Sequence, residues 1–129
     1  MISLLGINHL TLATTELDRL VGFYTGLLGA REAFARAATA SAPRIAVLDV
    51  GAADHLMIVE TAAAEPGGLD PLGNAGWGLR VGSYEQLCAV RARILEAGQP
   101  VGTIETLPTQ WTMTAYDPDG RAVDIRAHR

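Results

Sequence analysis

Two stretches of this chain follow the same pattern of residues, and this repeat limits the possible fold more than any other feature. Residues 7–29 begin with an alternation in which Leu10 and Leu12 are apolar and their neighbours are small or polar, as in a half-buried strand. Apolar residues at helical spacing follow, and a glycine ends the pattern. Residues 76–98 repeat the same order. Two strand–helix units in 129 residues predict a single domain made of two similar halves.

Each predicted helix opens with residues that can cap its first turn. Thr15 with Asp18 is a carboxylate variant of the capping box, and Ser83 with Gln86 is its fuller form. The apolar stripes are Leu17, Leu20, Val21, Tyr24, Leu27 and Leu28 in the first half, and Leu87, Val90, Ile94 and Leu95 in the second. Gly29 and Gly98 are expected to end the helices in the left-handed conformation. Each helix should therefore bury one face.

Three further strands are predicted in each half. Alternation and β-branched residues place them at 31–36, 44–50, 55–61, 101–105, 110–116 and 121–127. The sequence Asp-Pro-Asp-Gly at 117–120 is typical of a turn between the last two strands. Proline and glycine are frequent before Gly73, so residues 64–73 are predicted to link a module at 1–63 to a module at 74–129. Each half then reads as strand, helix and three strands.

Composition excludes several classes of protein. The net charge of −4 and the lack of a basic cluster argue against nucleic acid as a partner. No apolar run is long enough to cross a bilayer, and the first residues lack a basic leader, so no membrane association is expected. Cys88 is the only cysteine, which rules out an intrachain disulfide and fits a reducing compartment. We expect a cytoplasmic protein.

The tandem arrangement, with Asn8-His9-Leu10 near the start and Asp-Pro-Asp-Gly before the last strand, resembles the vicinal oxygen chelate superfamily. This group includes glyoxalase I, extradiol dioxygenases, fosfomycin-modifying enzymes and bleomycin-type resistance proteins. The likeness extends over residues 6–126. It implies an α+β fold of two tandem βαβββ modules, whose curved sheets surround a cavity with the helices outside. It also implies a homodimer, since such modules often pair.

The resemblance also indicates where a metal would be bound. Metal-using relatives take one ligand from an inward position on each of four strands, and these positions fall on His9, Met57, Gly76 and Asp124. Gly76 has no side chain, and the thioether of Met57 is a poor ligand for hard or borderline divalent ions. A catalytic site usually keeps three protein ligands, whereas His9 and Asp124 supply two. No metal or other cofactor is expected, and a divalent ion would need additional ligands.

Strand alternation predicts which polar residues face the cavity. If the apolar positions pack under the helices, then His9 and Asp124 point to the opposite face, together with Gly76 and Arg80. A guanidinium group on that face can hold a carboxylate or phosphate by two parallel hydrogen bonds. Alternatively, Arg80 forms an ion pair with Asp124, because a buried carboxylate needs a partner. Arg126 lies on the same face and is another candidate partner.

Two features of the second half remain open from the sequence. In one register, Thr112 and Thr114 face the cavity while Trp111 packs outward, and a shift by one residue would instead offer the indole as a stacking surface. Gly76 and Gly78 mark either a close approach of the backbone or room for a bulky ligand.

The sequence thus predicts a small-molecule-binding protein of the glyoxalase and bleomycin-resistance type with a degenerate metal site, which binds or sequesters an aromatic or acidic organic ligand. The candidate ligand-binding residues are His9, Met57, Gly76, Arg80, Trp111, Thr112, Thr114 and Asp124. An enzyme is the alternative: a lyase, isomerase or dioxygenase that binds a divalent ion through His9 and Asp124. A metal-free enzyme that uses the same two residues as acid and base is a third possibility.

Overall fold

The structure is a computed structural model that describes residues 2–62 and 76–129. The chain divides into two compact units, Met1–Ala64 and Glu65–Arg129, and each is described separately below. The predicted linker at 64–73, and with it the boundary between the two predicted modules, lies outside the described residues.

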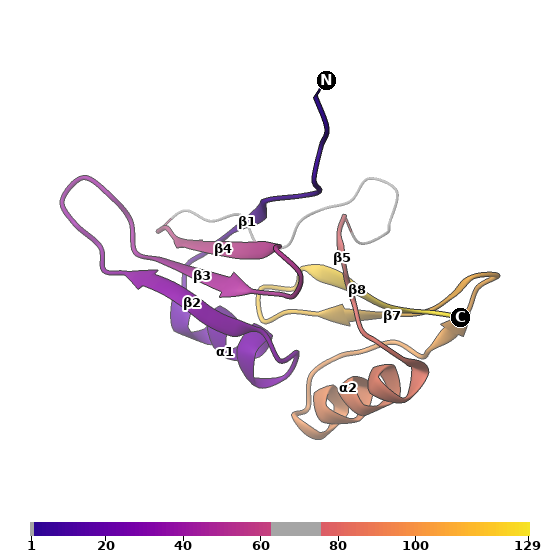
Figure 1. Ribbon diagram of the computed structural model, residues 1–129. Coiled ribbons are helices and arrows are strands. Elements are labelled where there is room, and N and C mark those ends of the chain that lie inside the picture. Colours follow the sequence, from indigo (N-terminus) through magenta and orange to yellow (C-terminus); the bar gives the residue numbers. More distant parts are fainter. Residues whose placement is uncertain (1, 63–75) are drawn as a thin grey trace. The chain divides into compact units, whose positions relative to one another are not determined.

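Unit 1 consists of one helix and a four-stranded sheet (Figure 1). Its elements are β1 (His9–Thr14), α1 (Leu17–Gly26), β2 (Arg31–Arg36), β3 (Ile45–Asp49) and β4 (His55–Glu60). The strand order is β1-β4-β3-β2. β1 runs parallel to β4, and the other neighbours are antiparallel. The first and last strands of the unit are therefore hydrogen-bonded to each other.

Unit 2 has the same connectivity. Its elements are β5 (Gly78–Arg80), α2 (Tyr84–Glu96), β6 (Glu105–Thr106), β7 (Gln110–Tyr116) and β8 (Ala122–His128). The strand order is β5-β8-β7-β6, with β5 parallel to β8. The predicted α+β class and the tandem βαβββ arrangement are confirmed.

The core of each unit lies between its helix and one face of its sheet. In unit 1, α1 packs on β3 and β4. The buried side chains there include Leu17, Leu20, Phe23, Tyr24, Leu48, Leu56 and Ile58. In unit 2, α2 packs on β8, and the buried set includes Leu87, Ile94, Met113, Val123 and Ile125. The predicted stripes were wrong at Leu95, which is exposed, and they omitted Phe23, which is buried.

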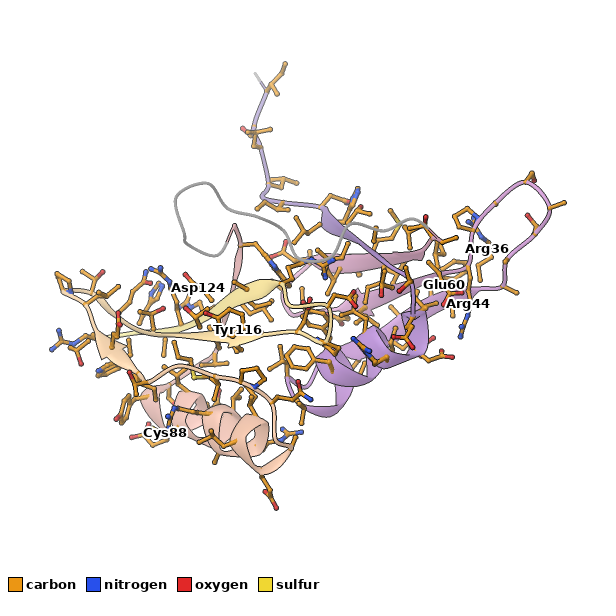
Figure 2. All side chains as sticks on the ribbon, turned by 180° about the vertical axis from the view of Figure 1, so that it is seen from behind. Arg36, Arg44, Glu60, Cys88, Tyr116 and Asp124 are labelled. Atoms are coloured by element: carbon orange, nitrogen blue, oxygen red, sulfur yellow. The ribbon has the colours of Figure 1, made fainter. Side chains whose placement is uncertain are left out.

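The predicted capping box of the first helix is wrong. The N-cap residue of α1 is Glu16, whose side chain makes no capping hydrogen bond. The backbone N–H of Leu17 donates instead to Oε2 of Glu60 on β4, at 2.9 Å, and Asp18 is paired with Arg44. Figure 2 shows Glu60 and Arg44 beside α1. The local cap that the sequence suggested is therefore absent. In its place, Glu60 accepts a hydrogen bond from Leu17, and Arg44 forms an ion pair with Asp18.

The second helix follows its prediction. The hydroxyl of Ser83 accepts a hydrogen bond from the backbone N–H of Gln86 at 3.1 Å, and Oε1 of Gln86 accepts from the N–H of Gly82 at 2.9 Å. Gly29 and Gly98 follow the two helices with φ of 82° and 74°. Both glycines therefore occupy the left-handed conformation that was expected at the helix ends.

Strand positions agree with the sequence except in one place. β2 and β7 have the predicted boundaries. The predicted strand at 101–105 is wrong, because Val101 forms only an isolated bridge with Ala115 and the strand β6 begins at Glu105. Neither helix in the described part of the chain is long and apolar enough to cross a membrane.

The turn between β7 and β8 contains a buried ion pair. Nη1 of Arg121 lies 2.7 Å from Oδ2 of Asp117, whose side chain is 0% exposed. Oδ1 of Asp117 accepts hydrogen bonds from the backbone N–H groups of Asp119 and Arg121, at 2.9 and 3.0 Å. Gly120 has a φ of 80°, which glycine adopts without strain. The predicted turn at 117–120 therefore exists. It is held by Asp117 at its start and by Arg121 directly after its end.

Candidate functional site

The sheet of unit 2 has a polar face on the side opposite to α2. Strand alternation places Val123 and Ile125 under the helix, so their neighbours on β8 point the other way. The polar side chains on this face come from four strands: Arg80 of β5, Glu105 of β6, Gln110, Thr112 and Thr114 of β7, and Asp124, Arg126 and His128 of β8. We call this set the polar face.

Asp124 is at the centre of a hydrogen-bonded chain on the polar face. The hydroxyl of Thr114 donates to Oδ1 of Asp124 at 3.1 Å. Nη2 of Arg126 donates to Oδ2 at 3.0 Å, and its Nη1 donates to Oε1 of Gln110 at 3.1 Å. Figure 2 labels Asp124 on this sheet. Both carboxylate oxygens are thus hydrogen-bonded, and the charge of Asp124 is balanced by Arg126.

Arg80 is directly beside Arg126 in the parallel register of β5 and β8. Its side chain is exposed and forms no ion pair or hydrogen bond with any described residue. Of the two arrangements that the sequence left open, the structure has Asp124 paired with Arg126 and not with Arg80. The guanidinium group of Arg80 is therefore an exposed cation with its donors available.

The two glycines of this region differ in what surrounds them. A Cβ atom added at Gly78 would lie 3.2 Å from both Cβ and the backbone O of Asp124. The absence of a side chain at Gly78 therefore lets β5 approach β8 closely. A Cβ atom at Gly76 would meet no described atom within 4 Å, so this position adjoins open space.

An open groove of about 370 Å³ lies along the edge of this face. Residues 76–80 form one side, and Gln110, Asp124, Arg126 and His128 form the other. The lining includes Arg80 and Arg126, and also Trp77 and Leu79, whose side chains alternate to the other face of β5. A groove of this size falls within the usual range for small-molecule sites.

In the register of β7, two of the predicted site residues lie on the polar face and a third lies on the opposite face. Thr112 and Thr114 register with Arg126 and Asp124. Trp111 is on the opposite face, where its ring centroid lies 5.0 Å from that of Tyr84 on α2. Of the two registers that the sequence allowed, the structure has the one with Thr112 and Thr114 on the polar face. The indole of Trp111 is packed against the helix and is not part of the groove.

His9 and Met57 belong to unit 1. Both lie on the face of its sheet away from α1, since β1 and β4 run in register and Thr11 pairs with Met57. Nδ1 of His9 lies 2.9 Å from Oδ1 of Asn8, and the imidazole is exposed. Glu60, also on β4, points to the helix side, where it caps α1. Met57 and Glu60 therefore lie on opposite faces of the sheet of unit 1.

The residues at the four family metal positions do not fit a divalent ion. Gly76 offers no donor atom, and Met57 offers only a thioether sulfur. Both oxygens of Asp124 already accept hydrogen bonds, one of them from a guanidinium group. Within residues 2–62 and 76–129, no group of three or more His, Cys, Asp or Glu side chains is placed to hold a metal ion.

Three polar groove residues were missing from the predicted site. Arg126 was considered only as a possible partner of Asp124, and Gln110 and His128 were not considered. Alternation from Thr112 and Asp124 would have placed Gln110 and His128 on the same face as Arg126. His128 was lost because the last strand was predicted to end one residue too early.

Comparison with known proteins connects this architecture to a family. The family model described as Glyoxalase/Bleomycin resistance protein/Dioxygenase superfamily matches residues 6–125. No curated protein matches the sequence. Solved structures match over nearly the whole chain, at identities low enough that they show the fold alone.

A glyoxylase/bleomycin resistance protein/dioxygenase domain from Frankia sp. EAN1pec has a TM-score of 0.82 at 21% identity, covering 98% of this chain and 100% of that one. TnmS3, an antibiotic binding protein from Streptomyces sp. CB03234, has a TM-score of 0.79 at 18% identity, covering 100% of both chains. The fosfomycin resistance protein FosX from Listeria monocytogenes has a TM-score of 0.73 at 19% identity, covering 98% and 94%. On the family match, this chain belongs to the Glyoxalase/Bleomycin resistance protein/Dioxygenase superfamily.

Proposed function

We propose that this protein binds and sequesters a small organic ligand with an aromatic or apolar body and an acidic group, and that it does so without a metal. The observation that carries the proposal is the pairing of Asp124 with Arg126, which leaves Arg80 without a counter-charge among the described residues. The acidic group of the ligand would bind Arg80 in the groove along β5 and β8.

The balance of charge among the groove residues favours an anion. Arg80 and Arg126 are direct neighbours in register, and like charges in this position repel each other. Asp124 is the only carboxylate among the described groove residues and balances one of the two cations. One positive charge remains, which a monoanionic ligand would neutralise. A carboxylate suits it best, because its two oxygens match the fork of the guanidinium group.

The remainder of the groove suits an apolar body. The backbone of residues 76–79 lines the groove beside Arg80, and Gly76 leaves open space at one end. Small-molecule sites typically combine a mostly apolar lining with a few polar groups that orient the ligand. The groove therefore provides one charged contact for orientation and room beside it for the body of the ligand.

The relatives support the same class of function. One structurally similar protein is an antibiotic binding protein and another is a fosfomycin resistance protein. At 18–19% identity their ligands do not transfer to this chain, because a shared fold does not fix the function of a site. They support binding of a small molecule, and the ligand class proposed here depends on Arg80.

The test is isothermal titration calorimetry with benzoate, 2-naphthoate and a panel of acidic natural-product antibiotics. Benzamide serves as the uncharged counterpart of benzoate. Arg80→Ala should weaken the best acid by about 1.5–3 kcal/mol, the usual value of a hydrogen bond to a charged group, and should not change the binding of benzamide. Gly76→Trp should block the open end of the groove and abolish binding. Arg19→Ala is the control, because Arg19 is an exposed arginine of unit 1.

Two results would contradict the proposal. If the best acid binds wild type, Arg80→Ala and Gly76→Trp equally well, the groove is not the site. If Zn²⁺, Ni²⁺, Mn²⁺ or Fe²⁺ binds stoichiometrically and raises the melting temperature, and Asp124→Asn or His9→Ala removes this effect, the chain is a metal-dependent lyase, isomerase or dioxygenase instead.

A further inference from the structure

Tyr116 places an aromatic ring on the same side of the unit 2 sheet as the groove. It is the last residue of β7 and is 40% exposed. Alternation along β7 puts it on the side of Thr112 and Thr114, which belong to the polar face. Tyr116 forms no hydrogen bond or ring contact with any described residue. Figure 2 labels Tyr116 and Asp124 on the same sheet. The ring is therefore available to a ligand on this side of the sheet.

The neighbours of Tyr116 across the sheet are small. In the antiparallel register of β7 and β8, Tyr116 pairs with Ala122. In the parallel register of β5 and β8, Gly78 pairs with Asp124, and the N–H of Asp124 extends the pairing to the residue before β5. The same register, continued by two residues, places Gly76 beside Ala122. One row across the three strands therefore consists of a glycine, an alanine and a tyrosine.

Few side chains occupy the path from Arg80 to Tyr116. On this side of the sheet, the two residues that precede Arg80 are Gly78 and Gly76, which have no side chains. Ala122 contributes only a methyl group. A Cβ atom added at Gly76 would meet no described atom within 4 Å, so the ring of Tyr116 does not fill the space beside this glycine. The groove is therefore open in the direction of Tyr116.

Asp124 lies between the two ends of this path. Its oxygens accept hydrogen bonds from Thr114 and Arg126, and its side chain is 18% exposed. A carboxylate that is paired and largely covered presents little charge to a ligand that passes over it. The path is therefore cationic at Arg80 and uncharged beyond Asp124.

The two ends of the path are farther apart than one aromatic ring can span. Arg80 pairs with Arg126 and Tyr116 pairs with Ala122, so their rows are four residues apart along β8. At about 3.3 Å per residue and about 4.8 Å between strands, the Cα atoms of Arg80 and Tyr116 are roughly 16 Å apart. Both side chains are long and extend into this span. An acid with a single ring, held at Arg80, ends before Tyr116, whereas an acid with two or three rings in line reaches it.

We propose that Tyr116 is a second contact for the ligand, and that an aromatic group of the ligand stacks on its ring while Arg80 binds the acid. This inference rests on the proposed function, because Arg80 must hold the acidic group. It narrows the ligand to an elongated aromatic acid whose rings lie in line with the carboxylate. Aromatic pairs attract each other beyond the area that they bury. Tyr116 therefore selects the length of the ligand, whereas Arg80 selects its charge.

The first test is isothermal titration calorimetry with benzoate and biphenyl-4-carboxylate. Wild type should bind the biphenyl acid more tightly than benzoate. Tyr116→Ala should weaken the biphenyl acid by roughly 2–12-fold, the value of one aromatic pair, and should not change benzoate. Tyr116→Phe keeps the ring and should bind both acids as wild type does. Tyr84→Ala is the matched control, because Tyr84 is 41% exposed on α2, on the other side of the sheet.

Arg80→Ala separates this inference from the proposed function. If Arg80→Ala weakens the biphenyl acid and Tyr116→Ala does not, the groove binds the acid but the ligand does not contact Tyr116, and this inference alone is wrong. If Arg80→Ala changes neither acid, the proposed function fails and this inference fails with it. Equal losses in Tyr116→Ala and Tyr116→Phe would also overturn the inference, because the contact would then be made by the hydroxyl group.

The second test is proton NMR of the tyrosine rings. The ring signals of Tyr116 are assigned as those that are lost in Tyr116→Phe. They should shift when the biphenyl acid is added and should stay in place with benzoate, because only the longer acid reaches the ring. Unchanged Tyr116 signals at saturating biphenyl acid, or equal affinity of wild type for the two acids, would overturn the proposal. Far-UV circular dichroism of each variant verifies that the fold is retained.

Discussion

The carboxylate of Glu60 caps the helix that begins at Leu17, a residue 43 positions earlier in the chain. Oε2 of Glu60 accepts a hydrogen bond from the N–H of Leu17 at 2.9 Å and lies 3.7 Å from Nη1 of Arg44. β4, the last strand of unit 1, thus supplies the capping acceptor that the N-cap residue Glu16 does not provide. A negative charge at a helix N-terminus is favourable, because the unpaired N–H groups there carry partial positive charge.

Replacement of Glu60 by alanine should lower the free energy of unfolding by about 1–2 kcal/mol, the usual value of an N-cap. The N–H of Leu17 would lose its acceptor, while Arg44 would keep Asp18. Urea unfolding followed by circular dichroism measures the change. Glu105→Ala is the control, because Glu105 is exposed and its side chain forms no bond with the rest of the described chain. An equal loss in the two variants would mean that the cap contributes nothing.

Alanine at Gly78 should cost about 1–3 kcal/mol of stability, as overpacking usually does. The added Cβ would lie 3.2 Å from the Cβ and the backbone O of Asp124, and β5 would have to move away from β8. Gly76→Ala meets no described atom within 4 Å and should leave stability within about 0.5 kcal/mol of wild type. Thermal and urea unfolding of both variants check the difference. Similar stabilities would show that β5 and β8 are not in close contact at this position.

Removal of Arg121 should be far more damaging than removal of an exposed arginine. Arg121→Ala would leave the buried carboxylate of Asp117 without its cation, at a cost of about 3 kcal/mol or more. Arg19→Ala breaks the pair of Arg19 with Glu16, in which both side chains are more than half exposed, and should change stability by less than about 1 kcal/mol. The same unfolding measurement gives both values. A loss below 1 kcal/mol for Arg121→Ala would contradict the role assigned to this ion pair.

Stability should fall at low pH in part because of Asp49. A hydrogen bond from the backbone N–H of Gly51, and then the side chain of Arg31, lower the pKa of Asp49 from its usual 3.8. The native state therefore binds fewer protons than the unfolded state as the pH falls through this region. The contribution of Asp49 is present above the unfolded pKa and is lost as the pH falls through the lower, folded value. Asp49→Asn should flatten the acid limb of the stability profile measured by urea unfolding, and an unchanged acid limb would contradict this role of Asp49.

The sequence predicts the elements of the fold well because the relevant forces are local. Residues 110–116 are rich in aromatic and β-branched side chains, and β7 has the predicted boundaries, as does β2 at 31–36. Ser83 and Gln86 are within one helical turn of each other, so their capping box is readable from spacing alone. The cap of α1 is different, because Glu60 is distant in sequence and Thr15 looks like a suitable cap. Only the pairing of β1 with β4 brings Glu60 to the helix.

For the candidate site, strand alternation predicts which face of the sheet each residue occupies, but it does not predict the contacts between side chains. Parity correctly places Arg80, Asp124 and Arg126 on one side of the sheet. Parity does not tell which arginine the carboxylate contacts, because both are within reach of it. The choice depends on side-chain reach along β8, where Arg126 is two residues from Asp124, and on Thr114 across from it on β7. The role of Gly78 likewise depends on the distance between two strands, which a sequence does not contain.

The parallel pairing of β1 with β4 also affects how the chain is made. His9 pairs with His55, and β1 has no other partner in its unit, so its place in the sheet is vacant until β4 has been synthesised. At about 5–20 residues per second, the ribosome needs roughly 2–9 s to extend the chain from Thr14 to Glu60. Throughout that time Leu10 and Leu12, like the apolar residues of segment 2–7 before them, have no sheet to cover them. The N-terminal residues are therefore the part of the nascent chain that most needs protection from other chains during translation.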